Sequence, residues 1–334
     1  MTVLVTGGGG FLGRYVVQAL LDRGEAVRVL ARGAYPDLAE RGVECVRGDI
    51  ADAEAVNRAV EGCDVVHHVA GQPGIWGPRE MYWRPNVEGT RNVVEACKAH
   101  GVGRLIYTSS PSAVFGREPH VGADESLPYP DTYLCHYPAS KAAGERLALG
   151  AHEPGVLHTT ALRPHLIWGP GDHNLIPRVI ERARAGRLAR VGDGTNEVSV
   201  VYVENAAQAQ VAAQDALQAD APAAGGKPYF IAQPEPVRLW DFIGAILEGV
   251  GAPAVTRSIS HRAARRIGAA FEAVYTILPL TSEPRMTRFV ADQLGTSHWY
   301  RVDAACRDLG YDPSISTEEG LRRLFAAYEA GQGP

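Results

Sequence analysis

The amino-acid sequence predicts an α/β fold: a doubly wound parallel sheet followed by a smaller, mainly helical C-terminal domain. Short β-branched runs alternate with helical patterns in the first half, which is the rhythm of such a sheet. A glycine-rich turn directly follows the first β-branched run, and after Pro164 the alternation stops. The 334 residues are 46% hydrophobic and 21% charged, which is typical of a globular chain of about two domains.

The predicted elements of the first half follow one another in regular order. Helical patterns begin near Gly13, Ala53, Pro85 and Pro138. The strands are expected at residues 2–6, 26–30, 44–47, 65–69, 105–109 and 159–162.

Beyond Pro164 the pattern favours a second unit that is interleaved with the first. A turn-rich segment at 168–172 precedes a helix near 175–185, a strand near 198–203, and helices at 240–250, 263–277 and 317–329. We therefore expect a sheet domain over residues 1–168 plus about 198–233. The smaller domain would comprise about 169–197 and 234–330.

Charge and cysteine content narrow the classes of partner. The chain has 33 Lys and Arg against 38 Asp and Glu, and this net charge of −5 supplies no overall positive field for a nucleic acid. The five cysteines are far apart and form no C-x-x-C, which favours neither a disulfide framework nor a metal site. The first strand leaves no room for a signal peptide, and the apolar segment 267–280 is too short to span a bilayer. We expect a cytoplasmic protein without a transmembrane segment.

A phosphate cradle is predicted directly after the first strand. The segment Gly7-Gly-Gly-Gly-Phe-Leu-Gly13 is a G-x-x-G-x-x-G motif that opens a helix. Glycines let the backbone approach a pyrophosphate, whose charge then faces the free N–H groups at the helix N-terminus. A glycine-rich turn that binds nothing is the alternative, but the strand before and the helix after disfavour it. The motif predicts a Rossmann-type dinucleotide site that begins with Gly7, Gly10, Phe11, Leu12 and Gly13.

Arg32 favours NADP(H) over NAD(H) as the cofactor. A free ribose 2′-hydroxyl usually meets an acid at the end of the second strand, whereas this strand ends in Leu30-Ala31-Arg32. A guanidinium pairs well with a 2′-phosphate. Arg14 and Arg28 compete for this role, and an ordinary surface position is the alternative for Arg32.

The ends of the third and fourth strands predict further cofactor contacts. Asp49, next to Ile50, offers a carboxylate to an adenine amino group, and the small Ala70 admits the cofactor ribose. His67 and His68 precede Ala70. Adjacent histidines on a strand point to opposite faces, so structural roles are favoured over a shared metal ion.

Tyr137 and Lys141 form the candidate reactive pair. Their spacing of four residues on a predicted helix places both side chains on one face. The reference pKa of a phenol is about 10, and a neighbouring ammonium is expected to lower it, which makes Tyr137 a usable proton donor. Tyr129 and Tyr133 precede Tyr137 at the same spacing of four residues, but neither has a lysine four residues later. Tyr133 is expected to pack or to contact substrate.

A hydroxyl at the end of the fifth strand should complete the site. The run Thr108-Ser-Ser-Pro-Ser112 supplies several, and we choose Ser110 to bind the substrate oxygen, with Ser112 and Thr108 as alternates. No G-x-S-x-G elbow surrounds Ser110, which argues against a serine hydrolase.

The glycine motif, the Ser/Tyr/Lys set and the length together resemble the extended short-chain dehydrogenase/reductase family. Within it, the segments Thr108–Phe115, Arg163–Asp172 and Tyr202–Ala207 are similar to the 3β-hydroxysteroid dehydrogenase and C-4 sterol decarboxylating branch. The 2-alkyl-3-oxoalkanoate reductases of bacterial long-chain olefin biosynthesis show the greatest resemblance, through Gly74-Ile-Trp-Gly-Pro78, Pro284-Arg-Met-Thr-Arg-Phe289 and Thr296-Ser-His-Trp-Tyr300.

The resemblance implies a role for each site residue. Tyr137 would be the general acid, Lys141 would bind the nicotinamide ribose and tune Tyr137, and Ser110 would orient the ketone. Thr108 and the backbone from Pro164 to Ile167 would lie against the cofactor.

The implied reaction is NADPH-dependent reduction of the 3-keto group of a 2-alkyl-3-oxoalkanoic acid to the 3-hydroxy acid. One alternative is an NAD(P)-dependent 3β-hydroxysteroid dehydrogenase of the sterol C-4 decarboxylating type. A more distant one is a non-catalytic, NADP-binding regulatory protein. Two alkyl chains need an apolar channel, for which the candidates are Ile75-Trp76, Trp83, Trp240 and the segment 263–280.

The expected partner is a small, lipid-like keto acid. Assembly with the thiolase, ligase and hydrolase enzymes of the same pathway, formation of a homodimer, and contact of the 263–280 segment with a membrane surface are open partner predictions. No nucleic acid is expected.

Overall fold

A seven-stranded parallel sheet forms the centre of the computed structural model, which describes residues 1–278, 280 and 282–332. Its strands run in the order β12-β7-β5-β4-β1-β2-β3. Every neighbouring pair is parallel, which confirms the predicted doubly wound α/β fold. The strands are β1 (Thr2–Thr6), β2 (Ala26–Ala31), β3 (Glu44–Arg47), β4 (Val65–His68), β5 (Arg104–Thr108), β7 (His158–Pro164) and β12 (Lys227–Ile231).

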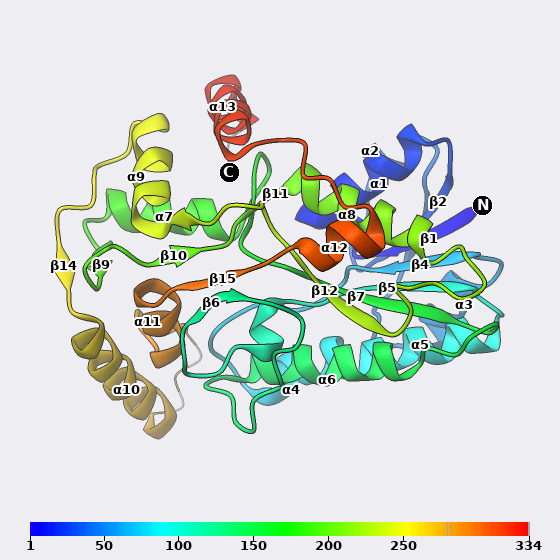
Figure 1. Cartoon of the computed structure of the whole chain (residues 1–334), viewed down its shortest axis with the longest axis horizontal. Helices are drawn as coiled ribbons and strands as arrows, with labels where there is room; N and C mark the ends of the chain where they lie inside the picture. The colour runs from blue at the N-terminus through cyan, green and yellow to red at the C-terminus, as the bar shows by residue number, and fades with distance from the viewer. Residues whose placement is uncertain (279, 281, 333–334) are drawn as a thin grey trace.

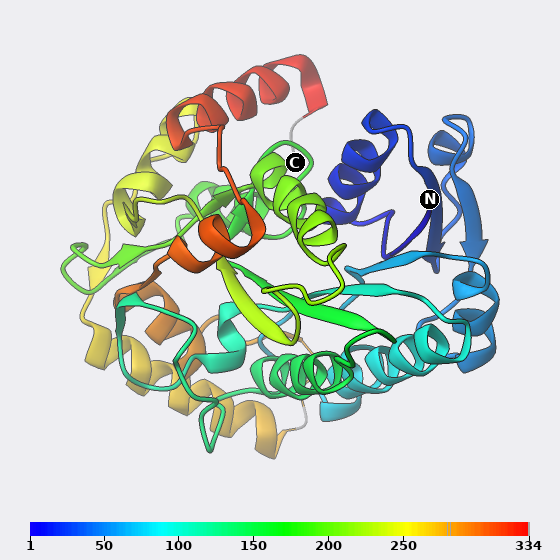
Figure 2. The same ribbon diagram turned by 45° about the vertical axis from the view of Figure 1, so that its right-hand side comes forward.

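Helices cover both faces of this sheet (Figure 1). Figure 2 shows the same two layers from a second direction. One face carries α1 (Phe11–Asp22), α8 (Val203–Ala216) and α12 (Asp303–Leu309), and the other carries α3 (Ala53–Val60), α5 (Gly89–Ala99) and α6 (His136–Gly150). Four short helical segments connect these elements: α2 (Pro36–Ala39), α4 (Arg79–Trp83), the π-helical turn Arg84–Glu88 and the 3₁₀ turn Pro111–Val114.

Alternation along the first strand shows why the sheet needs both layers. Val3 and Val5 belong to the hydrophobic core beneath α1 and α8, whereas Leu4 belongs to the core beneath α3 and α5. All three side chains are fully buried. Successive strand residues point to opposite faces, so a continuous apolar run requires helices on both sides.

A second hydrophobic core lies beyond β7, around the buried side chains of Trp168, Tyr202 and Phe242. A mixed four-stranded sheet in the order β13-β10-β15-β6 accompanies it, and its β6 comes from the first half of the chain. The strands of this region are β6 (His120–Ala123), β8 (Ile167–Trp168), β9 (Arg190–Val191), β10 (Glu197–Val198), β11 (Val201–Tyr202), β13 (Val237–Arg238), β14 (Ser258–Ile259) and β15 (His298–Tyr300). Its helices are α7 (Leu175–Arg184), α9 (Leu239–Gly249), α10 (His261–Ile277), α11 (Arg288–Gly295), α13 (Thr317–Ala327) and the π-helical end Tyr328–Gln332.

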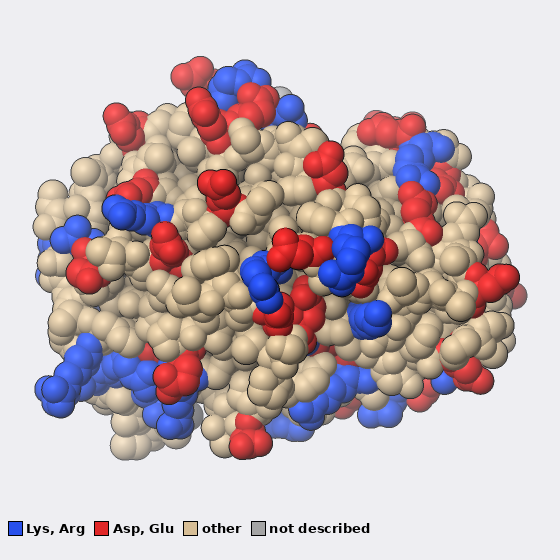
Figure 3. Space-filling view, viewed as in Figure 1, with Lys and Arg blue, Asp and Glu red and all other residues tan. Residues whose placement is uncertain are grey.

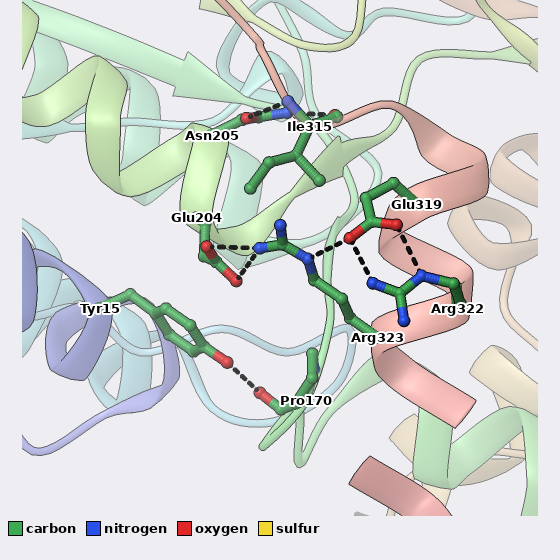
Figure 4. Close-up of polar contacts among 8 residues, drawn as sticks. All are labelled: Tyr15, Pro170, Glu204, Asn205, Ile315, Glu319, Arg322 and Arg323. Atoms are coloured by element: carbon green, nitrogen blue, oxygen red, sulfur yellow. Dashed lines mark hydrogen bonds and ion pairs between the residues drawn. The ribbon is translucent and has the colours of Figure 1, made fainter. Parts of the chain in front are cut away.

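Ion pairs fasten the C-terminal helix to the helix that covers the main sheet (Figure 4). Arg323 on α13 donates to both carboxylate oxygens of Glu204 at the start of α8, at 2.9 and 3.1 Å, and to Glu319 one turn earlier at 2.7 Å. Asn205 donates to the Ile315 carbonyl at 2.7 Å. Helix α13 and the segment before it are thereby fixed to the sheet region.

Most predicted elements are confirmed within a few residues, and one is wrong. The strand expected near 198–203 is two short strands in different sheets, and Val203 already begins α8. The alanine- and glutamine-rich sequence of α8 explains this, because these residues favour a helix. The helix expected near Pro85 is preceded by α4 and a π turn.

Charges of both signs are interspersed on the face shown in Figure 3, apart from a group of basic side chains at the lower left, over α10. All five cysteines are free. In the part of the chain that the structure describes, no helix combines the length and hydropathy needed to cross a bilayer. The segment predicted at 263–280 includes Pro279, which lies outside the described residues.

Candidate active site

The structure brings all the sequence-predicted site residues into one cleft of about 1130 Å³. The cleft lies where β1, β2, β4, β5 and β7 end, which is the usual position of ligands in open parallel sheets. The predicted residues that line it are Gly7, Gly10, Phe11, Leu12, Gly13, Arg32, Asp49, Ile50, Ala70, Thr108, Ser110, Tyr137, Lys141, Pro164 and Ile167.

Two glycines give the turn after β1 its shape. Gly7 has φ = 71°, and a Cβ atom there would stand 2.8 Å from Ala70 Cα at the end of β4. A Cβ atom on Gly13 would stand 2.1 Å from the Gly7 carbonyl oxygen. Neither position admits a side chain without moving backbone, so the turn lies unusually close to β4 and α1.

The first turn of α1 fits the pyrophosphate of a dinucleotide. Gly10 is the N-cap and offers no side-chain acceptor, and no acidic residue occupies the first turn. The N–H groups at this helix end therefore face the cleft without a side-chain partner, where they favour an anion. The small Ala70 and the carboxylate of Asp49 line the same cleft.

Of the three candidate arginines, Arg32 is the one that lines the cleft. Arg28 is held by the Ala59 carbonyl at 2.9 Å and by Glu44 at 2.8 Å. Arg14 forms an ion pair with Asp37. The ring of Tyr35 packs so closely over Gly9 that a Cβ there would stand 2.0 Å from it, and Tyr35 lines the cleft beside Arg32.

Tyr137 lies in the first turn of α6, where it is partly buried. Burial raises its pKa, although hydrogen bonds with the hydroxyls of Ser110 and Ser112 act in the opposite direction. The expectation that Lys141 lowers this pKa is therefore wrong for this structure. A raised pKa keeps the phenol protonated at neutral pH, which is the state a proton donor needs.

Ser110 caps the 3₁₀ turn after β5. Its Oγ accepts from the Ser112 N–H at 3.2 Å and lies 3.0 Å from the Ser112 Oγ. Both hydroxyls thus lie at the phenol of Tyr137, and the choice between Ser110 and Ser112 as the substrate-orienting group stays a prediction.

Lys141 is buried one helical turn after Tyr137. Its Nζ donates to the Thr108 carbonyl at 2.6 Å and lies 4.5 Å from the centre of the Tyr107 ring. Burial lowers its pKa to about 7, against the opposing field of Glu145. The amine is therefore a cleft-lining group that exchanges a proton near neutral pH.

A buried ion pair supports the reactive helix from behind. Glu145, one turn after Lys141, accepts from Arg163 Nε at 3.0 Å and Nη2 at 2.6 Å, and from the Tyr129 hydroxyl at 2.6 Å. Burial tends to raise the Glu145 pKa, but the hydrogen bonds and charge of Arg163 outweigh it and lower the pKa. This pair links α6 to β7 across the base of the cleft.

Sequence reasoning missed an aromatic wall on the substrate side of the cleft. His165, Phe115, Phe289, Gln293 and Tyr300 line the cleft together with Ser110 and Tyr137. These residues come from the position directly after β7, the turn after β5, α11 and β15, which are far apart in the sequence. His165 lies within the segment Arg163–Asp172, which carries the family resemblance, and directly follows the predicted Pro164, but neither signal gave its side chain a role.

A second cavity of about 480 Å³ is lined by Tyr82, whose ring centre lies 6.4 Å from that of Tyr137. Ile75 and Trp76 line this cavity as expected, and so do Tyr133 and residues of α10. Trp240 is instead 7% exposed in the second core. Trp83 lies under the Arg79 guanidinium and lines neither cavity. Of the tryptophans proposed for an alkyl channel, Trp76 is thus the one that lines either of these two cavities.

The two adjacent histidines of β4 have separate structural contacts. His67 bonds to Gln210 and Gln214 on α8, at 3.2 and 2.8 Å, whereas His68 bonds to Thr6 and Thr90 at 2.7 and 3.0 Å. This confirms their opposite orientation. Within the described chain, no three His, Cys, Asp or Glu side chains are placed to hold a metal ion.

The family model described as the 3-beta hydroxysteroid dehydrogenase/isomerase family matches residues 4–260. The 2-alkyl-3-oxoalkanoate reductase of Stenotrophomonas maltophilia is 49% identical over 99% of this chain and 100% of its own length. The protein of the same name from Shewanella oneidensis is 44% identical over 97% of this chain and 85% of its own. The human sterol-4-alpha-carboxylate 3-dehydrogenase, decarboxylating, is 33% identical over 97% of this chain and 87% of its own.

Solved structures share the complete fold. Gox2253 superposes with a TM-score of 0.81 at 25% identity and covers 100% of this chain and 99% of its own. MoeE5 in complex with UDP-glucose and NAD superposes with a TM-score of 0.76 at 25% identity and covers 99% of each chain.

Proposed function

The chain belongs to the 3-beta hydroxysteroid dehydrogenase/isomerase family, and on that premise we propose that it reduces the 3-keto group of 2-alkyl-3-oxoalkanoic acids to the 3-hydroxy acid. The single observation that carries the proposal is the full-length similarity, at 49% identity, to a reductase of that name. The sterol dehydrogenase is more distant, at 33% identity. The cleft, with Tyr137, Ser110 and Lys141 in it, supports an oxidoreductase.

The names of both kinds of relative state a substrate whose carboxylate is attached to the carbon next to the reacting carbon. A 2-alkyl-3-oxoalkanoate carries its carboxylate beside C2 and reacts at C3, and a sterol-4-alpha-carboxylate carries it on C4 and reacts at C3. We infer that a substrate of this chain likewise presents a carboxylate near the reacting ketone.

The chain's own side chains would supply alignment and a proton. Bound NADPH would supply the hydride to the keto carbon. The carbon–oxygen π bond then opens, and Tyr137 Oη donates its proton to the forming alkoxide. The hydroxyl of Ser110, or of Ser112 beside it, would hold the ketone oxygen, and Lys141 would bind the nicotinamide ribose and help Tyr137 regain a proton.

NADP(H) is the proposed form of the dinucleotide. The second strand ends at Ala31 without an acid, and Arg32 lines the cleft while Arg14 and Arg28 are engaged elsewhere. A guanidinium at this place matches a 2′-phosphate. The remaining proposed contacts are the glycine turn, Asp49, Ile50 and Ala70.

The second cavity is the proposed site for one alkyl chain. Ile75, Trp76, Leu134 and Ala139 contribute apolar side chains to its lining, beside charged groups such as Glu272 and Arg288. Tyr82, which also lines it, packs against Tyr137 of the cleft. The domain division at about residues 168, 198 and 233, the cytoplasmic location, a homodimer and the assembly with thiolase, ligase and hydrolase enzymes stay predictions.

Turnover by the purified protein tests the proposal. Oxidation of NADPH and of NADH is followed with a long-chain 2-alkyl-3-oxoalkanoate, and NAD(P)⁺ reduction is followed with a 3-hydroxysterol-4-carboxylate. We expect NADPH-dependent reduction of the keto acid to dominate. Activity confined to the sterol acid would replace the proposal with the sterol dehydrogenase, and equal use of NADH would refute the cofactor assignment.

A further inference from the structure

His165 stands at the end of β7, in the wall of the cleft that faces the reacting group. Its backbone N–H donates to the Ile231 carbonyl at 3.1 Å, and its side chain is only 7% exposed. It lines the cleft together with Ser110 and Tyr137. The mechanism described above uses no part of this imidazole.

The backbone that carries His165 adopts an unusual conformation. Leu166 has φ = 42°, and it is the one non-glycine residue with a positive φ among the residues that the structure describes. Leucine rarely adopts this conformation, and such strain persists where the surroundings hold it in place. Here the Leu166 side chain packs against the second core and its carbonyl accepts from the Val201 N–H at 3.4 Å. The turn therefore fixes the direction of the imidazole before it.

A chain of hydrogen bonds determines which ring nitrogen of His165 carries the proton. His298 Nε2 lies 2.8 Å from the Gln293 carbonyl oxygen, which only accepts, so this nitrogen donates. In a neutral His298, Nδ1 is then the acceptor, and it lies 2.6 Å from His165 Nε2. His165 Nε2 must donate, which leaves the lone pair on His165 Nδ1. Among the hydrogen bonds of the described chain, the one made by the His165 ring to another side chain uses Nε2, and the buried side chain lines the cleft.

Arg163, two residues before His165, is a charged group whose field reaches Tyr300, and it is paired with the buried Glu145. The titratable groups packed against the two histidines are Tyr300 on the same strand as His298, with ring centres 5.5 Å from His165, and His120 on β6, which bonds to Tyr300 at 3.1 Å. Burial lowers the pKa of both His165 and His298, with further contributions from the neighbouring histidines. Both rings are therefore neutral before a ligand binds.

The other basic groups of the cleft belong to its cofactor side. Arg32 follows β2, Arg84 lies 3.8 Å from Asp49, and His173 packs against Phe11 at the start of α1. Lys141 is engaged by the Thr108 carbonyl. Among the described lining residues, His165 is thus the basic group that remains on the substrate wall.

We propose that His165 Nδ1 binds the carboxyl group of the substrate and so determines that the enzyme acts on acids. This proposal rests on the proposed function. The carboxyl group enters together with one proton, which lies between its oxygen and Nδ1, because a lone pair facing a bare carboxylate would repel it. His298 and the Gln293 carbonyl hold the imidazole with Nε2 turned towards His298, which leaves Nδ1 available to a ligand. No bond to carbon is made or broken at this site.

Equilibrium binding tests the proposal independently of turnover. The protein, loaded with NADP⁺, is titrated with a 2-alkyl-3-hydroxyalkanoic acid and with the secondary alcohol that lacks its carboxyl group. Calorimetry in two buffers of different ionisation enthalpy counts protons taken up. We expect the wild-type protein to bind the acid at least tenfold more tightly than the alcohol and to take up close to one proton with the acid alone.

Two substitutions separate the function of His165 from its structural contact. His165→Gln retains a donor near the Nε2 position for His298 and removes Nδ1, whereas His165→Asn keeps a polar atom near Nδ1 and loses the contact with His298. We expect His165→Gln to abolish both the preference for the acid and the proton uptake, while binding of the alcohol changes less than threefold. His100→Gln, at the exposed residue directly after α5, is the matched control and should behave as wild type.

The outcomes separate failure of this proposal from failure of the proposed function. A wild-type protein that binds acid and alcohol equally, or a His165→Gln variant that weakens both ligands to the same extent, overturns the assignment of His165. A protein that prefers the acid through His165 but does not reduce the keto acid would retain this assignment and refute the proposed reaction.

Discussion

The cofactor side and the substrate side of the cleft are built in different ways. On the cofactor side, short segments that follow individual strands supply the residues, and much of the contact surface is backbone: the Gly7 turn, the start of α1 and the Pro164 segment. On the substrate side, side chains from the position directly after β7, from α11 and from β15 meet in one wall. Positions 165 and 298 are hydrogen-bonded although 133 residues separate them.

The cofactor side is thus formed by residues that are close together in the sequence, whereas the substrate side is formed by residues that are far apart in it. The geometry of a glycine turn is set by a few consecutive residues, so a substitution there should lower the affinity for the cofactor and leave substrate binding unchanged. The geometry of a wall of side chains depends on how distant segments pack, so substitutions of its members should have coupled effects. Substitutions on the two sides of the cleft should therefore differ in what they impair.

Tyr137→Phe should produce the largest loss. The substitution keeps the ring and removes the proton donor, so we expect kcat to fall by about 10²–10⁴-fold with little change in NADPH affinity. Stopped-flow measurement of NADPH oxidation and fluorescence titration of the cofactor check the two parts. Tyr229→Phe, which removes a hydroxyl bonded to Asp308 away from the cleft, is the control. Full activity of Tyr137→Phe would refute the assigned acid.

Gly13→Ala should weaken the cofactor side selectively. The added Cβ would stand 2.1 Å from the Gly7 carbonyl oxygen, so the phosphate turn must shift. We expect at least a roughly tenfold loss of NADPH affinity by fluorescence titration. Gly150→Ala on α6, where a Cβ meets no atom within 4 Å, should bind NADPH normally. Unchanged affinity of Gly13→Ala would mean that the turn does not hold the pyrophosphate.

Arg32→Ala should change the choice of dinucleotide. Losing a charged hydrogen-bonding partner of a 2′-phosphate costs about 1.5–3 kcal/mol, so we expect the NADPH to NADH ratio of kcat/KM to fall by about 10- to 100-fold. NADH kinetics should hardly change, and Arg58→Ala on α3 serves as the exposed control. An unchanged ratio would assign the preference to other residues, such as Tyr35.

Lys141→Met should raise the stability of the protein while lowering its enzyme activity. Because burial lowers the Lys141 pKa from 10.5 to about 7, the unfolded chain binds more protons than the folded one between these values. The destabilising effect of Lys141 is therefore complete below pH 7 and disappears as the pH rises towards 10.5. At pH 6.5 we expect the free energy of unfolding, measured by denaturant titration, to rise by about 1–3 kcal/mol, after the lost hydrogen bond to the Thr108 carbonyl is included. At pH 9 the rise should be smaller. A loss of stability at both pH values would contradict this.

Tyr300→Phe should have the smallest effect. The Tyr300 ring stacks on Phe230 with centres 4.1 Å apart, and the substitution keeps this packing while removing the hydroxyl that bonds to His120. We expect a change below about 1.5 kcal/mol in the free energy of unfolding, measured by denaturant titration. A much larger loss would show that hydrogen bonds, and not ring packing, hold the substrate wall together.

The strand ends and the reactive pair could be predicted from the sequence because their information is local. The run before Gly7, the missing acid at Ala31, and the spacing of Tyr137 and Lys141 each lie within one strand–turn–helix unit, and the structure places them all at one cleft. The direction in which the pKa of Tyr137 shifts could not be predicted from the sequence. This direction depends on burial by the surrounding elements, and burial outweighs the neighbours that lower the pKa.

The alternation of strands and helices, the glycine turn and the residues that can donate a proton could be predicted from the amino-acid sequence. Periodicity and backbone preference act over a few residues, so a short stretch of sequence is enough to recognise them. Three features follow from tertiary packing instead: Trp240 lies in the core, β6 joins β15, and His165 meets His298. These outcomes depend on which distant surfaces exclude water together, and no local stretch of sequence carries that information.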